Sequence, residues 1–160
     1  MRLNILFSLL ISILFIYFIS IIVTSGDAFF EFYSKNIRSS LFTGFLTLGG
    51  FLFSLKTFII VKMKENVYDD KKYLENLERQ RKLNPNISHY GPLKRLSDLL
   101  FFSILSSIIT AASQFSIGLY KNQVSAYVCI FLSIFTLTLF IVSLIIIKRN
   151  LDTWFKYLEN

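Results

Sequence analysis

Residues 3–24, LNILFSLLISILFIYFISIIVT, form a run of 22 residues without a charged side chain. As a helix this run is roughly 33 Å long, and the hydrocarbon core of a bilayer is about 30 Å thick. Three further apolar runs follow at residues 41–61, 99–120 and 124–147, the first of them interrupted by Lys56. Because backbone groups in lipid must be paired within the segment, each run is predicted to be a transmembrane helix.

The composition agrees with this prediction. Of the 160 residues, 54% are hydrophobic, and the mean hydropathy is +0.57. Too few polar residues remain to cover four such runs in a soluble protein. The first run is longer than the core of about 7–15 residues of a signal peptide, and no Ala-x-Ala site follows it, so we expect a retained span. We predict one all-α integral membrane domain, residues 1–160, with four helices in two hairpins.

The positive charges predict the orientation, because Lys and Arg accumulate in cytoplasmic segments. Arg2, nine residues within 62–95 and three within 148–160 give thirteen on one side, against Lys35, Arg38 and Lys121 on the other. Both termini and residues 62–95 are therefore expected in the cytoplasm. The net charge of +7 is then a topology signal that also attracts anionic membrane lipids. It does not predict direct nucleic acid binding.

The charged cytoplasmic segment is predicted to be helical. No Gly or Pro occurs between Gly50 and Pro85, which favours a projection of the second helix into the cytoplasm. The sequence leaves open whether that helix is continuous through residues 65–70. Lys71–Glu75, Glu75–Arg79 and Glu78–Lys82 are spaced for i,i+4 pairs. An apolar stripe on this helix is expected to pack against a second copy, a soluble partner or the membrane surface. The candidate partner-binding residues are Tyr73, Leu74, Leu77, Arg79, Arg81 and Lys82.

Two amphipathic segments flank the spans. The stretch DAFFEFY at residues 27–33, within the outer loop 25–40, is predicted to form a short interfacial helix with its rings inward and its carboxylates outward. After the last span, Leu151, Trp154, Phe155 and Leu158 recur at i, i+3, i+4 and i+7. This spacing predicts an amphipathic C-terminal helix, residues 148–160, that lies on the inner leaflet.

Small and polar residues form a stripe on each of the last three spans. Such residues let helices approach closely in lipid, either within one chain, between copies, or around a polar pore. Lys56 is costly inside a span; it either snorkels to the inner headgroups or faces a cavity between copies. The candidates for an oligomer or pore interface are Gly44, Thr47, Gly50, Ser54, Lys56 and Gln114.

The residue types needed for catalysis are missing from the spans. Cys129 and His89 are single, so no metal or cofactor site is predicted, and Gly49-Gly50 lacks the Lys-Ser/Thr of a phosphate loop. No carboxylate lies within a span. We therefore expect neither an enzyme nor a cofactor-binding protein. A transporter would need a polar site at the midplane, for which Gln114 is the one strong candidate.

The plan of the chain resembles that of small four-span bacterial membrane proteins of antiphage defence systems, of which the membrane subunit of Kiwa is an example. The similar segments are Lys56-Thr57-Phe58, Val67-Tyr68-Asp69 and Tyr90-Gly91-Pro92-Leu93. The resemblance implies a homo-oligomer in the bacterial inner membrane that monitors the envelope and holds a soluble cytoplasmic effector protein. The sequence leaves two main functions open: this sensor or scaffold, and a pore that depolarises the membrane.

Overall fold

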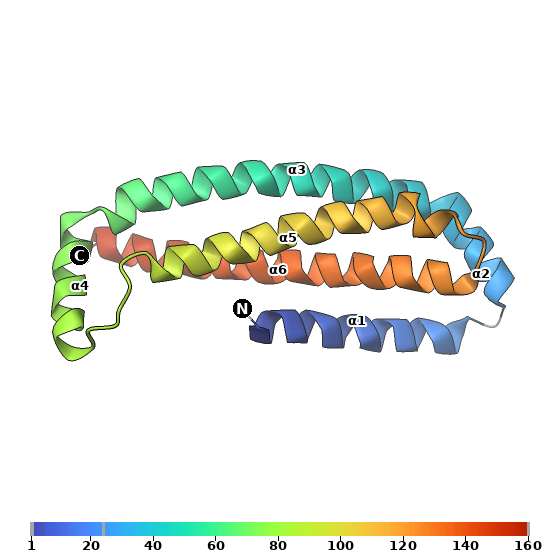
Figure 1. The fold of residues 1–160 in the computed structure, drawn as a ribbon, viewed down its shortest axis with the longest axis horizontal. Helices are drawn as coiled ribbons and strands as arrows, with labels where there is room; N and C mark the ends of the chain where they lie inside the picture. The colour runs from blue at the N-terminus through green and yellow to red at the C-terminus, as the bar shows by residue number, and fades with distance from the viewer. Residues whose placement is uncertain (1, 24, 160) are drawn as a thin grey trace.

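The computed structural model describes the backbone of residues 2–23 and 25–159 and the side chains of residues 3–23 and 25–152. All regular secondary structure in these residues is helical, as predicted. In chain order, the elements are α1 (Arg2–Ile22), α2 (Gly26–Phe32), the π-helical turn η1 (Tyr33–Ile37), α3 (Arg38–Met63), the π-helical turn η2 (Lys64–Tyr68), α4 (Lys71–Leu83), α5 (Gly91–Phe115), the 3-10 turn η3 (Ile117–Leu119) and α6 (Gln123–Glu159) (Figure 1).

Among the described residues, four helical stretches are long and apolar enough to cross a membrane. They are α1, the continuous helix from α2 to η2, α5 together with η3, and α6. Each overlaps one of the four predicted spans. We call the end of the molecule that carries α4 the α4 end, and the opposite end the α2 end (Figure 1).

The long helices lie in a row rather than in two hairpins. Figure 1 shows the order α3, α5, α6, α1, and the extensive helix contacts join α3 to α5, α5 to α6, and α6 to α1. The predicted hairpin of the last two spans is present as α5 and α6. The predicted hairpin of the first two spans is wrong, because α1 and α3 lie at opposite edges of the row.

The helical connection at the α2 end explains this order. The segment predicted as an interfacial helix is α2, but no loop follows it, because the helix runs through η1 directly into α3. The ring of Phe29 lies 5.1 Å from that of Tyr127 on α6, and the side chain of Tyr33 is completely buried. These contacts hold α2 across the end of α6, so that the chain enters α3 beside α5.

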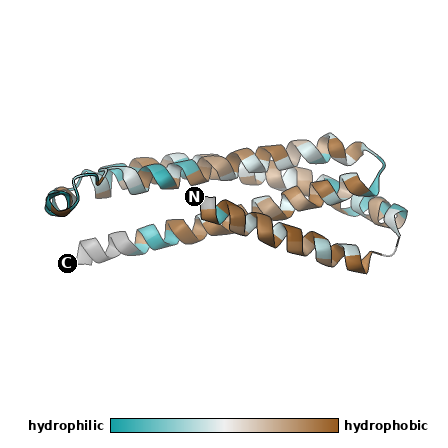
Figure 2. Ribbon diagram, turned by 60° about the horizontal axis from the view of Figure 1, so that its bottom comes forward, coloured by the Kyte–Doolittle hydropathy of each residue, from teal (hydrophilic) through white to brown (hydrophobic). Residues whose placement is uncertain are grey.

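Buried polar side chains line the contact between α5 and α6, whereas the exposed side chains of the long helices are largely apolar. The hydroxyls of Ser103 on α5 and Ser143 on α6 lie 2.8 Å apart, and those of Thr110 and Thr136 lie 2.7 Å apart. Figure 2 shows that the long helices are largely hydrophobic, and many of their Leu, Ile and Phe side chains are exposed. The small-residue stripes of α5 and α6 are therefore used for packing within one chain, which was one of the predicted alternatives.

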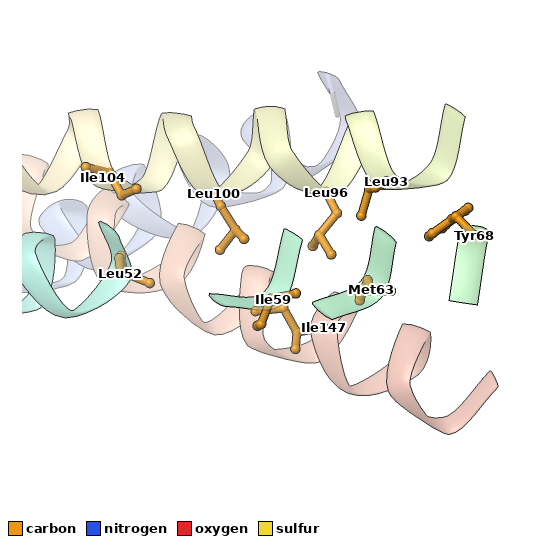
Figure 3. Close-up of a cluster of buried hydrophobic side chains, with 9 residues drawn as sticks. All are labelled: Leu52, Ile59, Met63, Tyr68, Leu93, Leu96, Leu100, Ile104 and Ile147. Carbon is orange, nitrogen blue, oxygen red and sulfur yellow. The ribbon is translucent and has the colours of Figure 1, made fainter. Parts of the chain in front are cut away.

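A hydrophobic cluster joins three helices towards the α4 end (Figure 3). Leu96 and Leu100 of α5 are fully buried against Ile59 and Met63 of α3 and Ile147 of α6. The cluster continues to Tyr68, the last residue of η2. It therefore fixes the position from which the chain leaves α3.

The sequence left the continuity of the second helix through residues 65–70 open, and the structure shows an interruption there. The helix ends at Tyr68, and α4 begins after a turn and lies across the ends of the long helices (Figure 1). Asp70 has an extended backbone and accepts a 2.8 Å hydrogen bond from the amide nitrogen of Lys72. This N-cap pairs an amide that a new helix leaves unbonded, so a helix starts here without a preceding Gly or Pro.

The last helix, α6, extends from Gln123 to Glu159 without a break. The backbone of residues 148–159 is helical, as predicted, but it continues the last span and is not a separate element. The side chains of Trp154, Phe155 and Leu158, on which the amphipathic prediction rests, lie outside the described side chains. Membrane contact by this segment stays a prediction.

Candidate functional site

The apolar stripe of α4 packs against the chain itself. Leu77 is 5% exposed, and Leu74 is half-buried. The hydroxyl of Tyr73 donates a 3.2 Å hydrogen bond to the backbone oxygen of His89, in the loop that returns to α5. Leu77 and Tyr73 are therefore not an open partner-binding surface as predicted, because residues of the same chain cover them.

An aromatic stack fixes this loop on α4. The ring of His89 lies 5.8 Å from that of Tyr73 and 4.1 Å from that of Tyr90, and both pairs are stacked. Nε2 of His89 lies 2.6 Å from the backbone oxygen of Tyr68. A carbonyl oxygen only accepts, so Nε2 carries the proton in this contact. The single histidine of the chain thus has a structural role in the described fold.

A tyrosine–aspartate contact closes the turn before α4. The hydroxyl of Tyr90 donates a 2.8 Å hydrogen bond to Oδ1 of Asp69. The negative carboxylate stabilises the protonated phenol, and this hydrogen bond is the main reason that the pKa of Tyr90 is raised. The loop before α5 and the turn before α4 are thereby joined at the surface.

The outward face of α4 is charged and open. Arg79 and Lys82 are exposed and make no hydrogen bond or ion pair with any described residue, whereas Nε of Arg81 donates a 3.1 Å hydrogen bond to the oxygen of Ile87. None of the three expected i,i+4 pairs on α4 forms an ion pair in the described structure. The face is therefore more weakly self-paired than its sequence predicted.

Leu83 was not singled out by the sequence pattern. It is the last residue of α4 and is 91% exposed, the most exposed large hydrophobic side chain in the described residues. Its position at the helix end, after the apolar stripe, gave no periodic signal. Together with Arg79 and Lys82 it forms what we call the α4 face.

A row of small residues lies on the outward side of α3. Thr43, Thr47, Gly50 and Ser54 are all exposed, and we call them the α3 seam; Gly44 lies at its edge. A Cβ added to Gly44 or Gly50 meets no atom within 4 Å, whereas one added to Gly49 lies 3.6 Å from Ser107 of α5. The seam thus faces away from the rest of the chain.

Two of the three hydroxyls of the α3 seam, those of Thr47 and Ser54, are already paired. Oγ1 of Thr47 donates to the oxygen of Thr43 at 2.9 Å, and Oγ of Ser54 donates to that of Gly50 at 3.3 Å. Such bonds back to the helix satisfy the donors of polar groups in lipid. The α3 seam therefore consists of small side chains, and the hydroxyl protons of Thr47 and Ser54 are satisfied within the helix.

Lys56 and Gln114 do not lie on the α3 seam, although we expected all of these residues at one interface. Nζ of Lys56 lies 5.1 Å from the ring centroid of Phe101 on α5, a cation–π distance. The side chain is half-buried between α3 and α5. Lys56 is therefore turned towards its own chain.

Gln114 is the centre of a buried network and is wrongly predicted as an interface residue. It is 1% exposed. Its Oε1 accepts from Tyr33 at 2.6 Å, and its Nε2 donates to the oxygen of Cys129 and to Oγ of Ser133, each at 3.2 Å. All of these partners belong to the same chain. Together they satisfy an amide that would be costly to bury without hydrogen bonds.

A groove separates α3 from α6 towards the α4 end. Its volume is about 500 Å³, and Phe58, Ile59, Leu144 and Ile147 contribute to an almost entirely apolar lining with Lys62 at its edge. It exists because α5 lies between α3 and α6 in the row. The sequence had no signal for it, since the order of the helices decides which apolar faces remain open.

The described residues contain no group of three His, Cys, Asp or Glu side chains that could hold a metal ion. The surfaces left open for packing or docking are the α3 seam, the α4 face and the apolar groove. Compared with protein-family models, curated proteins and solved structures, the chain shows no significant match to any of them.

Proposed function

We propose that this protein is a homo-oligomeric scaffold or sensor of the bacterial inner membrane, whose copies meet through the α3 seam and whose α4 face holds a soluble cytoplasmic protein. The observation that carries the proposal is the outward position of the α3 seam. The small-residue stripes of α5 and α6 are buried by packing within the chain, whereas the α3 seam is exposed. A role in antiphage defence rests on the resemblance of the sequence.

Assembly through the α3 seam follows from the physics of helices in lipid. Side chains of Leu, Ile and Phe make more contact with acyl chains than glycine does. A lipid-facing stripe of Gly, Thr and Ser therefore makes few van der Waals contacts with the lipid. Between two helices the same residues permit close approach of the backbones. Phe51 and Phe58 are exposed at the flank of the seam, where they can pack around such a contact.

The distribution of positive charge supports a cytoplasmic α4 face. Nine of the seventeen Lys and Arg residues lie within residues 62–95, which contain α4, and the positive-inside rule assigns this segment to the cytoplasm. Lys35, Arg38 and Lys121 lie at the opposite end. Arg38 is also used in the fold there, because its guanidinium donates a 3.0 Å hydrogen bond to the oxygen of Gly118.

The α4 face suits a protein partner with an acidic surface. Because the inner side of α4 is held by its own chain, Arg79 and Lys82 are presented on a fixed helix. A carboxylate of the partner protein can pair with these two side chains, and no existing ion pair has to be broken first. Leu83 adds one apolar anchor of the kind that interfaces bury at their centre.

The proposal is tested by native mass spectrometry of the tagged protein, extracted gently from its own host. A defined multimer with a stoichiometric soluble protein supports the scaffold. The double variant Arg79→Glu/Lys82→Glu should lose the soluble protein but keep the multimer. The matched control Lys71→Glu/Lys72→Glu, with the same charge change on the same helix, should retain both.

The pore remains the alternative function. A defined multimer without a partner, combined with depolarisation of the membrane on expression, would favour the pore over the scaffold. A bare monomer would contradict both functions. The hydroxyls of Thr47 and Ser54 argue against a pore, since their protons bond to the backbone of α3.

A further inference from the structure

A second, smaller pocket lies where α1, α5 and α6 meet. Its volume is about 270 Å³, and three polar side chains line it, one from each helix: Asn4, Arg95 and Asn150. The remaining lining includes Leu96, Leu99 and Ile146. The pocket thus combines a polar rim with an apolar wall.

The polar rim is rich in unused donors. The side chains of Asn4, Arg95 and Asn150 make no hydrogen bond or ion pair with any described residue. A guanidinium has five N–H donors and no acceptor, and each amide adds two more donors. No carboxylate among the described side chains lines the pocket, and Asp98, one turn beyond Arg95, forms no ion pair with it. This donor set is suited to an oxyanion, above all to a phosphate.

The position of the pocket identifies the source of that phosphate, if the proposed membrane orientation holds. Asn4 lies at the start of the first span, Arg95 four residues before the third, and Asn150 three residues after the fourth. All three therefore lie at the level of the inner headgroups. Leu99 and Ile146 continue from the rim towards the apolar part of the helices, where an acyl chain would follow.

We infer that the pocket binds an anionic phospholipid of the inner leaflet, with the headgroup phosphate between Arg95, Asn4 and Asn150 and an acyl chain along Leu99 and Ile146. Basic pockets between membrane helices on the cytoplasmic side recognise lipids by this combination of charge and depth. The lipid would also join α1 to α5, two helices that are otherwise held together through α6.

The test uses the full-length protein in a neutral detergent and native mass spectrometry with added phosphatidylglycerol or phosphatidylcholine carrying the same acyl chains. We expect phosphatidylglycerol to remain bound preferentially. Arg95→Gln should weaken its binding about tenfold, as expected for the loss of a charge-assisted contact. Asn150→Leu, which leaves the net charge unchanged, should also weaken it. Lys94→Gln, an exposed neighbour that does not line the pocket, is the control and should bind normally.

Each outcome decides the inference. Equal binding by Arg95→Gln and the native protein, or an equal loss in Lys94→Gln, would overturn it in favour of unspecific attraction to charge. Displacement of the lipid by inorganic phosphate alone would show a free-anion site and would also overturn the lipid assignment. Melting temperatures without lipid should be the same for all variants. Because binding is measured in detergent, it is independent of the α3 seam and of any soluble partner.

Discussion

The hydroxyl of Tyr33 donates a 2.6 Å hydrogen bond to Oε1 of Gln114, a residue 81 positions away along the chain. The contact joins η1 to α5 inside the α2 end, where Gln114 also bonds to α6. It therefore ties the connection between the first two long helices to the hairpin formed by the last two.

Gln114→Leu is predicted to destabilise the protein. The substitution leaves the buried hydroxyl of Tyr33 without its acceptor, and an unsatisfied buried group costs about 1–3 kcal/mol. Tyr33→Phe should cost less, because polar contacts between helices in lipid average about 0.6 kcal/mol. Unfolding in detergent measures both, and the double variant should fall short of the sum of the two effects. Simple additivity would argue against the contact.

Gly118→Ala is predicted to be destabilising although alanine is small. A Cβ at this position lies 2.7 Å from the hydroxyl oxygen of Tyr33 and 3.4 Å from Sγ of Cys129. The neighbours must move to make room, and overpacking of this kind costs about 1–3 kcal/mol. The melting temperature of Gly118→Ala, compared with that of Gly44→Ala, measures the effect; equal values would show that the site is open.

Adjacent glycines on α3 should respond differently to the same substitution. Gly50→Leu is predicted to leave the fold of the monomer intact but to abolish assembly, because the position is open in the chain and lies on the α3 seam. Gly49→Leu should instead lower the free energy of unfolding by about 1–3 kcal/mol, since it enters the contact with α5. Thermal unfolding and light-scattering mass in detergent separate the two effects; a reversed result would place the interface elsewhere.

The Tyr90–Asp69 contact is predicted to weaken in alkaline solution. The carboxylate raises the pKa of Tyr90 above its ordinary value of 10.0. A raised folded-state pKa means that the contact stabilises the fold below pH 10 and is lost as the pH rises through the raised value. Asp69→Asn should lower this pKa towards the ordinary value. Carbon NMR of labelled tyrosine, with Tyr90→Phe to assign the signal, measures it; an unchanged pKa in Asp69→Asn would disprove the cause.

The long helices could be predicted because their signal is local. The uncharged run 3–24 and helix α1 differ by one or two residues at each end, since span length is set by the bilayer and by charge. The break before α4 could not be predicted because no Gly or Pro, the usual helix breakers, occurs there. Asp69-Asp70 carried the alternative signal, an N-cap residue, but such residues also occur within charged helices.

The order of the helices could not be predicted from the sequence. The stripe containing Ser103 and Ser107 indicates that α5 packs closely on something, but it does not identify the neighbour. That choice depends on contacts across long sequence separations, such as Tyr33 with Gln114. For the same reason Gln114 and Lys56 were predicted at an interface, although the fold turns both towards their own chain.

Cysteine cross-linking in native membranes tests most directly whether copies of this protein meet through the α3 seam. Thr47→Cys, Gly50→Cys and Ser54→Cys should each form a covalent dimer on mild oxidation, whereas Ile141→Cys, exposed on α6, should not. The native protein is the control and should form no covalent dimer, because its Cys129 is fully buried. Dimers from the seam positions alone would support the account. Cross-linking at Ile141 instead of the seam, or at none of these positions, would contradict it.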